Sequence, residues 1–265
     1  MKNFLVIGNP IKHSLSPKLH NFWIKNHDLK AVYNKKEINN INLKDLIQEL
    51  RTNKITGANV TVPFKKLVIP HLDEVSNLAK TTSSVNTIYK RGEKIVGDNT
   101  DSSGFEKALD HIDYKVAGKK IFLLGAGGVA PSIIYSLKKM KAGSITLSNR
   151  TKEKAQRIKE FFPNINIVNW GVMVDFDMII NATSLGLNND DKLDFITDNN
   201  YKNKLFYDVI YNPKKTNFLA IGKKNGSRIE NGKLMFLYQA QLAFEIWHGI
   251  KPLVDEAAID LVTND

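Results

Sequence analysis

The sequence contains no cysteine among its 265 residues. This absence excludes disulfide bonds, thiolate catalysis and cysteine-ligated metal sites, and it is typical of a reducing compartment. The six histidines are scattered and form no HExxH or HxH pair, so we expect no metal site.

The sequence also lacks a long hydrophobic run. No stretch reaches the about eighteen apolar residues of a membrane-spanning helix, and the opening MKNFLVIGNP lacks the pattern of a signal peptide. We therefore expect a cytoplasmic protein without a membrane segment. A chain of 265 residues is long enough for two domains, each with its own core.

Positive charge is in excess: 38 lysines and arginines face 27 acidic residues, a formal net charge of +11 at pH 7. The lysines occur in singles and pairs and build neither a long basic block nor an arginine-aromatic pattern. We therefore expect no nucleic-acid binding, whereas the excess favours anionic small molecules as ligands.

The first hundred residues alternate short apolar runs with amphipathic segments, which is α/β patterning. Ser16 and Pro17 are typical of a helix start, with the serine as cap and the proline at the first helical position. The turn-rich segment GDNTDSSGF (97–105) is interpreted as a hinge, followed by a helix over Gly104–His111. The predicted strands are Asn3–Gly8, Ala31–Glu37, Gly57–Val62 and Asn86–Tyr89, and the predicted helices are Pro17–Asn26, Leu43–Thr52 and Val75–Lys80.

The segment KKIFLLGAGGVAPSIIYSL (119–137) indicates a nucleotide-binding unit. A buried strand turns through glycines into a helix, whose N-terminal N–H groups suit phosphate oxygens, although Ala130 occupies the third glycine position. Further strands and helices follow and predict a doubly wound parallel sheet of Rossmann type. The tail differs, because Lys233–His248 and Leu253–Val262 are predicted helices with no strand between them.

The next predicted strand favours NADP over NAD. A Rossmann unit that prefers NAD carries an acidic residue about 20 positions downstream for the ribose 2′-hydroxyl. Here Asn149 and Arg150 occupy that place, with Lys152 and Lys154 behind them, and cations suit a 2′-phosphate. The alternative is a solvated first turn of the next helix.

Five polar segments lie at predicted strand ends or beyond the second sheet, where open α/β sheets bind ligands. Each has an ordinary structural explanation: Ser14 and Ser16 as caps, Asn86 as a turn residue, Asp101 as a helix cap and Gln239 as a buried amide. Their joint occurrence favours a binding site. The segments are NPIKHSLSP, NVTVPFK, SSVNT, GDNTD and LMFLYQAQ.

Over nearly its whole length the chain resembles the shikimate dehydrogenase family. The matching segments are NPIKHSLSP (9–17), ANVTVPFK (58–65), VNT (85–87), GDNTD (97–101), GAGG (125–128), NRT (149–151), NATSLG (181–186), YDVIYNPKKT (207–216) and NGKLMFLYQA (231–240). The resemblance implies reversible NADPH-dependent reduction of 3-dehydroshikimate to shikimate, a step of aromatic amino-acid and chorismate biosynthesis. It also implies an N-terminal α/β substrate domain (1–100 with 238–265) and an NADP-binding Rossmann-type domain (101–237).

The resemblance further implies roles for particular residues. Lys65 is the expected acid–base, with Asp101 beside it. The substrate residues are Ser14, Ser16 and Tyr211 at the carboxylate, and Thr61, Asn86, Asp101 and Gln239 at the ring hydroxyls. The cofactor residues are Gly125, Ala126, Gly127, Gly128 and Val129 at the pyrophosphate, Asn149, Arg150 and Lys154 at the 2′-phosphate with the adjacent Thr151, and Val209 and Gly232 near the nicotinamide.

Three positions depart from the commoner family pattern: Ser102 replaces a glycine, Pro131 an arginine and Asn77 an acidic residue. Two other functions stay open at this point. One is a quinate/shikimate dehydrogenase of broader specificity, and the other is a catalytically silent module that binds a nucleotide or sugar acid. The presence of both Lys65 and Asp101 argues against the silent module, because a binder needs no proton donor. A homodimer is also left open.

Overall fold

The computed structural model describes residues 1–188, 193–197 and 200–263. The chain forms two compact units. The first unit comprises Met1–Gly104 and Leu237–Asp265, and the second comprises Phe105–Phe236. The chain passes from one unit to the other within helix α5 (Asp101–His111) and again within helix α9 (Lys233–His248).

The first unit contains a mixed sheet with the strand order β2-β1-β3-β5-β6-β4. Strand β1 runs parallel to β2 and β3, whereas β5 runs antiparallel to β3 and β6. The residues that follow β1, β3 and β6 and those that precede β5 therefore share one edge of the sheet. The strands are β1 (Lys2–Gly8), β2 (Ala31–Glu37), β3 (Gly57–Val60), β4 (Glu74–Val75), β5 (Thr87–Arg91) and β6 (Lys94–Asp98).

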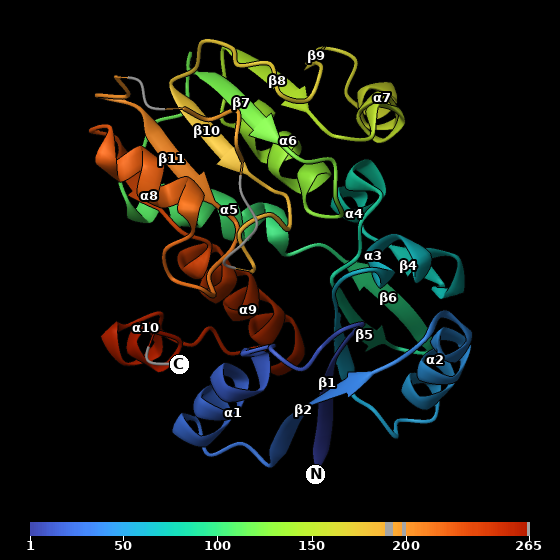
Figure 1. Ribbon diagram of the computed structural model, residues 1–265. Helices are drawn as coiled ribbons and strands as arrows, with labels where there is room; N and C mark the ends of the chain where they lie inside the picture. The colour runs from blue at the N-terminus through green and yellow to red at the C-terminus, as the bar shows by residue number, and fades with distance from the viewer. Residues whose placement is uncertain (189–192, 198–199, 264–265) are drawn as a thin grey trace. The chain divides into compact units, whose positions relative to one another are not determined.

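Helices α1 (Ser16–Asn26) and α2 (Leu43–Arg51) lie on opposite sides of this sheet (Figure 1). The apolar face of α2 repeats at helical spacing and joins the buried core with strand residues such as Val60 and Ile88. The unit also contains α3 (Phe64–Leu67), α4 (Asn77–Thr82), α10 (Glu256–Leu261) and the larger part of α9, with short 3-10 turns at Asn40–Asn42 and Ile69–His71.

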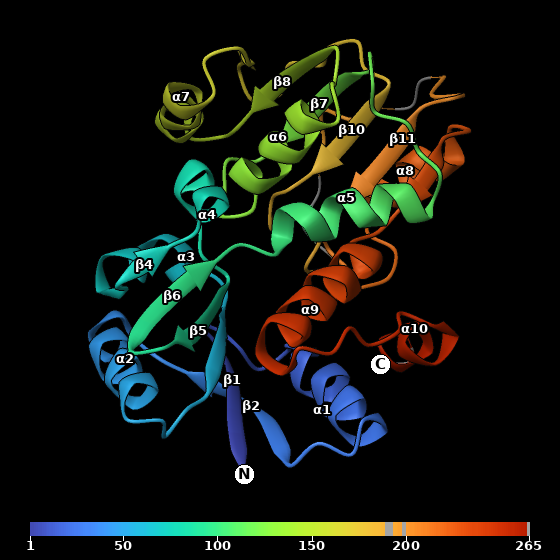
Figure 2. The ribbon, with the colours of Figure 1, turned by 180° about the vertical axis from the view of Figure 1, so that it is seen from behind.

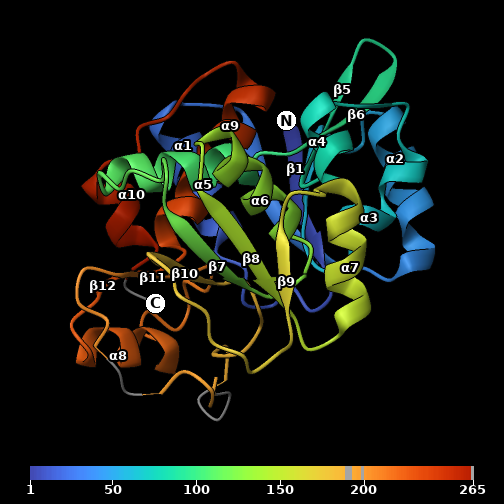
Figure 3. The same cartoon turned by 90° about the horizontal axis from the view of Figure 1, so that it is seen from above.

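The second unit contains a parallel sheet with the order β12-β11-β10-β7-β8-β9, which is the strand order of a Rossmann domain. Helices α6 and α8 cover its opposite faces (Figures 2 and 3), so the predicted doubly wound sheet is confirmed. The elements are β7 (Lys120–Leu124), α6 (Ala130–Lys139), β8 (Ser144–Ser148), α7 (Lys152–Phe161), β9 (Asn166–Val168), β10 (Met178–Asn181), β11 (Leu205–Asp208), α8 (Asn217–Lys224) and β12 (Arg228–Glu230).

The central strands β10 and β11 of the second sheet are buried along their whole length. Such continuous burial is typical of a parallel sheet covered by helices on both faces. Phe122, Phe206 and Phe218 pack in its core. Among the described residues, no helix has the length and apolar character needed to cross a bilayer.

The structure corrects the predicted helix starts in the first unit. Val75 belongs to β4, and α4 begins two residues later because Ser76 caps it, its Oγ accepting the Ala79 N–H at 3.2 Å. The C-terminal helix begins at Glu256 rather than Leu253, since Asp255 caps it in the same way at 2.9 Å to the Ala258 N–H. In both places a side-chain cap outweighs apolar spacing.

The predicted start of the helix at the expected hinge is also wrong. Helix α5 begins at Asp101, so the DSSG residues form its first turn. The sequence predicts a helix start at Gly104, because the preceding serines and the glycine itself are common turn formers. Helices α3 and α8 and strand β12 were not predicted, and α3 and β12 have too few residues to show a period.

Candidate active site

A buried ion pair lies at the shared edge of the first sheet. Lys65 Nζ donates to Asp101 Oδ2 at 2.5 Å, with side chains 13% and 7% exposed. Lys65 belongs to the one-turn helix α3 rather than to the end of a strand, which corrects the sequence prediction. An ammonium held in place by a largely buried carboxylate has the geometry of a positioned proton donor.

Asn86 joins this pair to a third element. The residue precedes β5 and is 2% exposed. Its Nδ2 donates to Asp101 Oδ1 at 2.9 Å and to Gln239 Oε1 on α9 at 3.4 Å, while its Oδ1 accepts the Thr100 N–H at 2.8 Å. Asn86 is therefore part of the site and does more than complete a turn.

Ser14, Ser16 and Thr61 follow β1 and β3 at the same edge of the sheet. Ser14 Oγ accepts the Ser16 N–H at 3.3 Å. Ser16 is the first residue of α1 and does not cap it, because the cap position falls on Leu15, which has no side chain able to accept. Ser16 is buried, and so is Tyr33 in the same unit, a residue that sequence reasoning missed.

Tyr211 belongs to the second unit. Its ring stacks on Phe236, with ring centroids 4.7 Å apart. Its contact with a substrate carboxylate stays a prediction.

The glycine-rich turn after β7 forms a cradle. Gly125 has φ +103°, and a Cβ there would meet the backbone of Ala182 at 2.8 Å. At Gly127, by contrast, a Cβ would meet only the Ala182 oxygen, at 3.8 Å, so the loop leaves space beside it. Helix α6 follows with Val129 at its cap position and no side-chain cap. Its first N–H groups are therefore suited to an anionic ligand.

Asn149 connects this turn to the segment after β8. Its Oδ1 accepts the Ala126 N–H at 2.9 Å, and its Nδ2 donates to the Thr151 oxygen at 2.7 Å. Arg150 is exposed, and within the described part of the chain no salt bridge engages Arg150 or Lys154. Two cations without a protein counter-ion suit a phosphate ligand.

Val209 and Gly232 lie against each other, since a Cβ on Gly232 would overlap the Val209 carbonyl oxygen. Sequence reasoning missed the neighbouring Asp208, which accepts from Thr216 Oγ1 at 2.6 Å and from Asn181 Nδ2 at 3.0 Å. Burial raises the pKa of Asp208 to about 6. These bonds fix the segments that follow β10 and β11. The NATSLG and YDVIYNPKKT matches were the sequence signal from which Asp208 could have been found.

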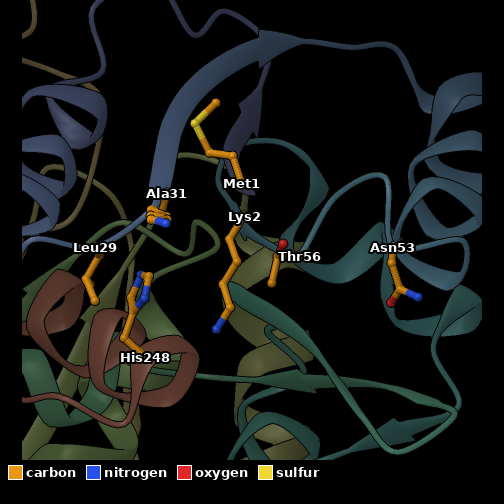
Figure 4. A pocket seen from close by; sticks show the side chains of 8 residues that line it. Met1, Lys2, Leu29, Ala31, Asn53, Thr56 and His248 are labelled. Atoms are coloured by element: carbon orange, nitrogen blue, oxygen red, sulfur yellow. The ribbon is translucent and has the colours of Figure 1, made fainter.

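A hollow of about 460 Å³ opens at the other edge of the first sheet (Figure 4). Its lining includes Lys2, Ala31, Thr56 and His248, which lie at the amino ends of β1, β2 and β3 and at the end of α9. None of the site residues described above lines it.

A Rossmann sheet whose phosphate cradle is followed by free cations, in one chain with a buried lysine–carboxylate pair, defines a pyridine-nucleotide dehydrogenase of a small polar substrate. Three family models match this chain. They are the shikimate dehydrogenase substrate binding domain (residues 6–88), shikimate / quinate 5-dehydrogenase (106–211) and the shikimate 5′-dehydrogenase C-terminal domain (234–257). The chain belongs to the shikimate dehydrogenase family.

Individual relatives agree along the full length. A shikimate dehydrogenase (NADP(+)) of Pelagibacter ubique is 55% identical over 261 residues, which cover 98% of each chain. The crystal structure of shikimate dehydrogenase from Aquifex aeolicus has a TM-score of 0.90 and 38% identity, covering 100% of this chain and 98% of its own. The Thermus thermophilus enzyme, in complex with NADP(H) and shikimate, has a TM-score of 0.87 and 28% identity, covering 99% of this chain and 98% of its own.

Proposed function

We propose that this protein catalyses the reversible NADPH-dependent reduction of 3-dehydroshikimate to shikimate, a step of aromatic amino-acid biosynthesis, with Lys65 as the acid–base. The observation that carries the proposal is the buried Lys65–Asp101 pair at the sheet edge that also holds Ser14, Ser16, Thr61 and Asn86. The relative at 55% identity is an NADP(+)-dependent shikimate dehydrogenase.

Lys65 performs the proton transfer in this proposal. When the ketone is reduced, negative charge develops on its oxygen, and the ammonium first stabilises that charge and then donates a proton from Nζ. In the direction of oxidation, neutral Lys65 accepts the hydroxyl proton. Asp101 orients Nζ through the 2.5 Å contact, and its second oxygen is held by Asn86 at 2.9 Å.

The other residues of the first unit bind and orient the substrate. The hydroxyls of Ser14 and Ser16 donate hydrogen bonds to the carboxylate. Thr61, Asn86, Asp101 and Gln239 contact the ring hydroxyls, where paired donors and acceptors select a polyhydroxylated ring.

The second unit fits a bound NADP. Gly125 to Val129 and the start of α6 take the pyrophosphate, and Arg150 and Lys154 take the 2′-phosphate. Asn149 fixes both loops through its bonds to Ala126 and Thr151. The close pair of Val209 and Gly232 forms part of the nicotinamide contact. When bound, the cofactor supplies the hydride.

The same proposal assigns residues 1–100 with 238–265 to substrate binding and residues 101–237 to NADP binding. It places the protein in the cytoplasm, in line with the absence of cysteine. It includes no role in binding nucleic acid, and sedimentation of the purified protein distinguishes a monomer from a homodimer.

One assay tests the proposal and its nearest rival. Shikimate and quinate are each combined with NADP and with NAD, and the absorbance of the reduced nicotinamide is followed. We expect the pair of shikimate and NADP to be oxidised fastest. Comparable rates with quinate indicate a quinate/shikimate dehydrogenase of broader specificity. No reduction with any pair refutes catalysis and favours the silent binding module.

A further inference from the structure

A buried chain of hydrogen bonds leads to the Lys65–Asp101 pair in the first unit. It begins at the hydroxyl of Tyr33 on β2. Tyr33 Oη lies 2.6 Å from Asn59 Oδ1, and Asn59 Nδ2 lies 3.0 Å from the backbone oxygen of Asn86. From Asn86 the chain reaches Asp101 at 2.9 Å.

Every member of this chain is shielded from water. Tyr33 is 1% exposed, Asn59 6%, Asn86 2% and Thr87 0%. A polar group that loses its partner in such a place cannot turn to solvent instead. The order of donors and acceptors along the chain is therefore strongly constrained.

The hydroxyl of Tyr33 determines which atoms along the chain donate and which accept. Burial raises the pKa of Tyr33 well above its usual range, so its hydroxyl stays protonated and donates to Asn59 Oδ1. With its oxygen occupied, Asn59 presents Nδ2 to the Asn86 oxygen and to Thr87 Oγ1, the latter at 3.2 Å. The Thr87 hydroxyl, which accepts that bond, donates to Asn86 Oδ1 at 3.1 Å and lies 3.4 Å from the Thr100 hydroxyl.

This chain contributes to the orientation of Asn86. Its Oδ1 receives the Thr87 hydroxyl at 3.1 Å, together with the Thr100 N–H at 2.8 Å and the Thr100 hydroxyl at 3.2 Å, so its Nδ2 faces Asp101. If the Asn86 amide were flipped, its oxygen would face the Asp101 carboxylate. The carboxylate that holds Lys65 would then lose a donor.

The ring of Tyr33 is itself held by packing. It stacks on His20 with ring centroids 4.2 Å apart and an interplanar angle of 2°. Trp247 lies against the same ring at 6.0 Å and is fixed by its Nε1 bond to the Ile88 oxygen at 3.1 Å. The phenol therefore has little freedom to turn away from Asn59.

We propose that Tyr33 is a positioning residue of the reaction, which acts through Asn59, Thr87 and Asn86 to hold Asp101 and Lys65 in their productive arrangement. The role rests on the proposed function of Lys65 as the acid–base. In this role Tyr33 does not itself contact the reacting atoms. Its hydroxyl acts on the proton-transfer end of the site through Asn59.

The main test compares Tyr33→Phe with wild type in shikimate oxidation by NADP. We expect kcat to fall by about tenfold, the effect of losing one buried hydrogen bond that supports the transition state. The KM for shikimate should rise by less than about twofold, since Ser16 keeps its hydroxyl for the substrate. General loosening of the site would raise KM as well. Tyr207→Phe is the matched control, because the Tyr207 hydroxyl is buried without a partner in the described structure.

A second pair of variants keeps the test valid if Tyr33→Phe folds poorly. Thr87→Ser retains the hydroxyl that donates to Asn86 and should keep a kcat near that of wild type. Thr87→Val has nearly the same shape without the hydroxyl and should lose about tenfold in kcat. The double variant Tyr33→Phe with Thr87→Val should have a kcat little lower than that of Thr87→Val alone, because both changes break the same chain of hydrogen bonds.

Three outcomes separate the possibilities. An active wild type with unchanged kcat in Tyr33→Phe and Thr87→Val refutes the positioning role and leaves the proposed function intact. A parallel rise of KM in both variants also refutes it, in favour of a structural role. A wild type that oxidises no shikimate refutes the proposed function, and the role of Tyr33 with it.

Discussion

Replacing Lys65 by methionine keeps the length of the side chain and removes its charge. If Lys65 donates the proton and stabilises the developing oxyanion, the turnover number should fall by about 10²–10⁴-fold, the usual range for a general acid–base. The KM for shikimate should change much less, because the interaction is strongest in the transition state.

The same change should also lower stability. Asp101 is 7% exposed at its side chain, and the methionine variant leaves its carboxylate without a cation. Breaking a buried ion pair in this way costs about 3–5 kcal/mol in free energy of unfolding. The double variant Lys65→Met with Asp101→Asn removes both charges and should recover most of that stability. Its turnover should stay low, which separates the catalytic loss from the loss of stability.

Steady-state rates and urea denaturation measure the two effects on the same samples. The neighbouring Lys66→Met is the matched control, because Lys66 lies in the same helical turn but is exposed. We expect this control to behave as wild type in both measurements. If Lys65→Met is folded and turns over like Lys66→Met, Lys65 is not the proton donor, and Asp101 becomes the candidate.

Three further predictions concern the cofactor, the substrate and pH. Arg150→Ala should raise the KM for NADP and leave that for shikimate nearly unchanged, and equal use of NADP and NAD by the wild type would contradict this. Ser14→Ala and Ser16→Ala should each weaken shikimate binding by about 1.5–3 kcal/mol, chiefly in KM; an unchanged KM would reduce that serine to a structural role. Burial lowers the pKa of His20 from 6.5 to about 3, so the unfolded chain binds its proton first as pH falls. Between about pH 7 and 4.5, urea denaturation should therefore show wild type losing about 2.5 kcal/mol more stability than His20→Phe, and equal losses would refute this.

The Rossmann sheet could be predicted because its signals are local. A buried strand before Gly125, a backbone turn that only glycine adopts easily, and a helix after it lie within one short segment. The parallel order of the remaining strands then follows from their alternation with helices. The role of the cations after β8 in binding a phosphate could likewise be predicted from their position in the sequence alone.

Much of the detailed site could not be predicted, because it depends on contacts between distant residues. Tyr33 and Asn59 are 26 positions apart, and nothing in the pattern of either segment indicates their hydrogen bond. The helical turn that carries Lys65 is too short to show a period and directly follows Pro63. The error at Ser16 has a different cause, since the cap position of α1 falls one residue earlier, on Leu15.

The central claim is that this chain transfers hydride and a proton between shikimate and NADP. The most direct measurement incubates the purified protein with shikimate and NADP, counts the NADPH formed and identifies the product by mass spectrometry. The account predicts one NADPH for each shikimate consumed and a product lighter by two hydrogens, with the reverse conversion when 3-dehydroshikimate and NADPH are supplied. Shikimate of unchanged mass, with no NADPH formed, would contradict it.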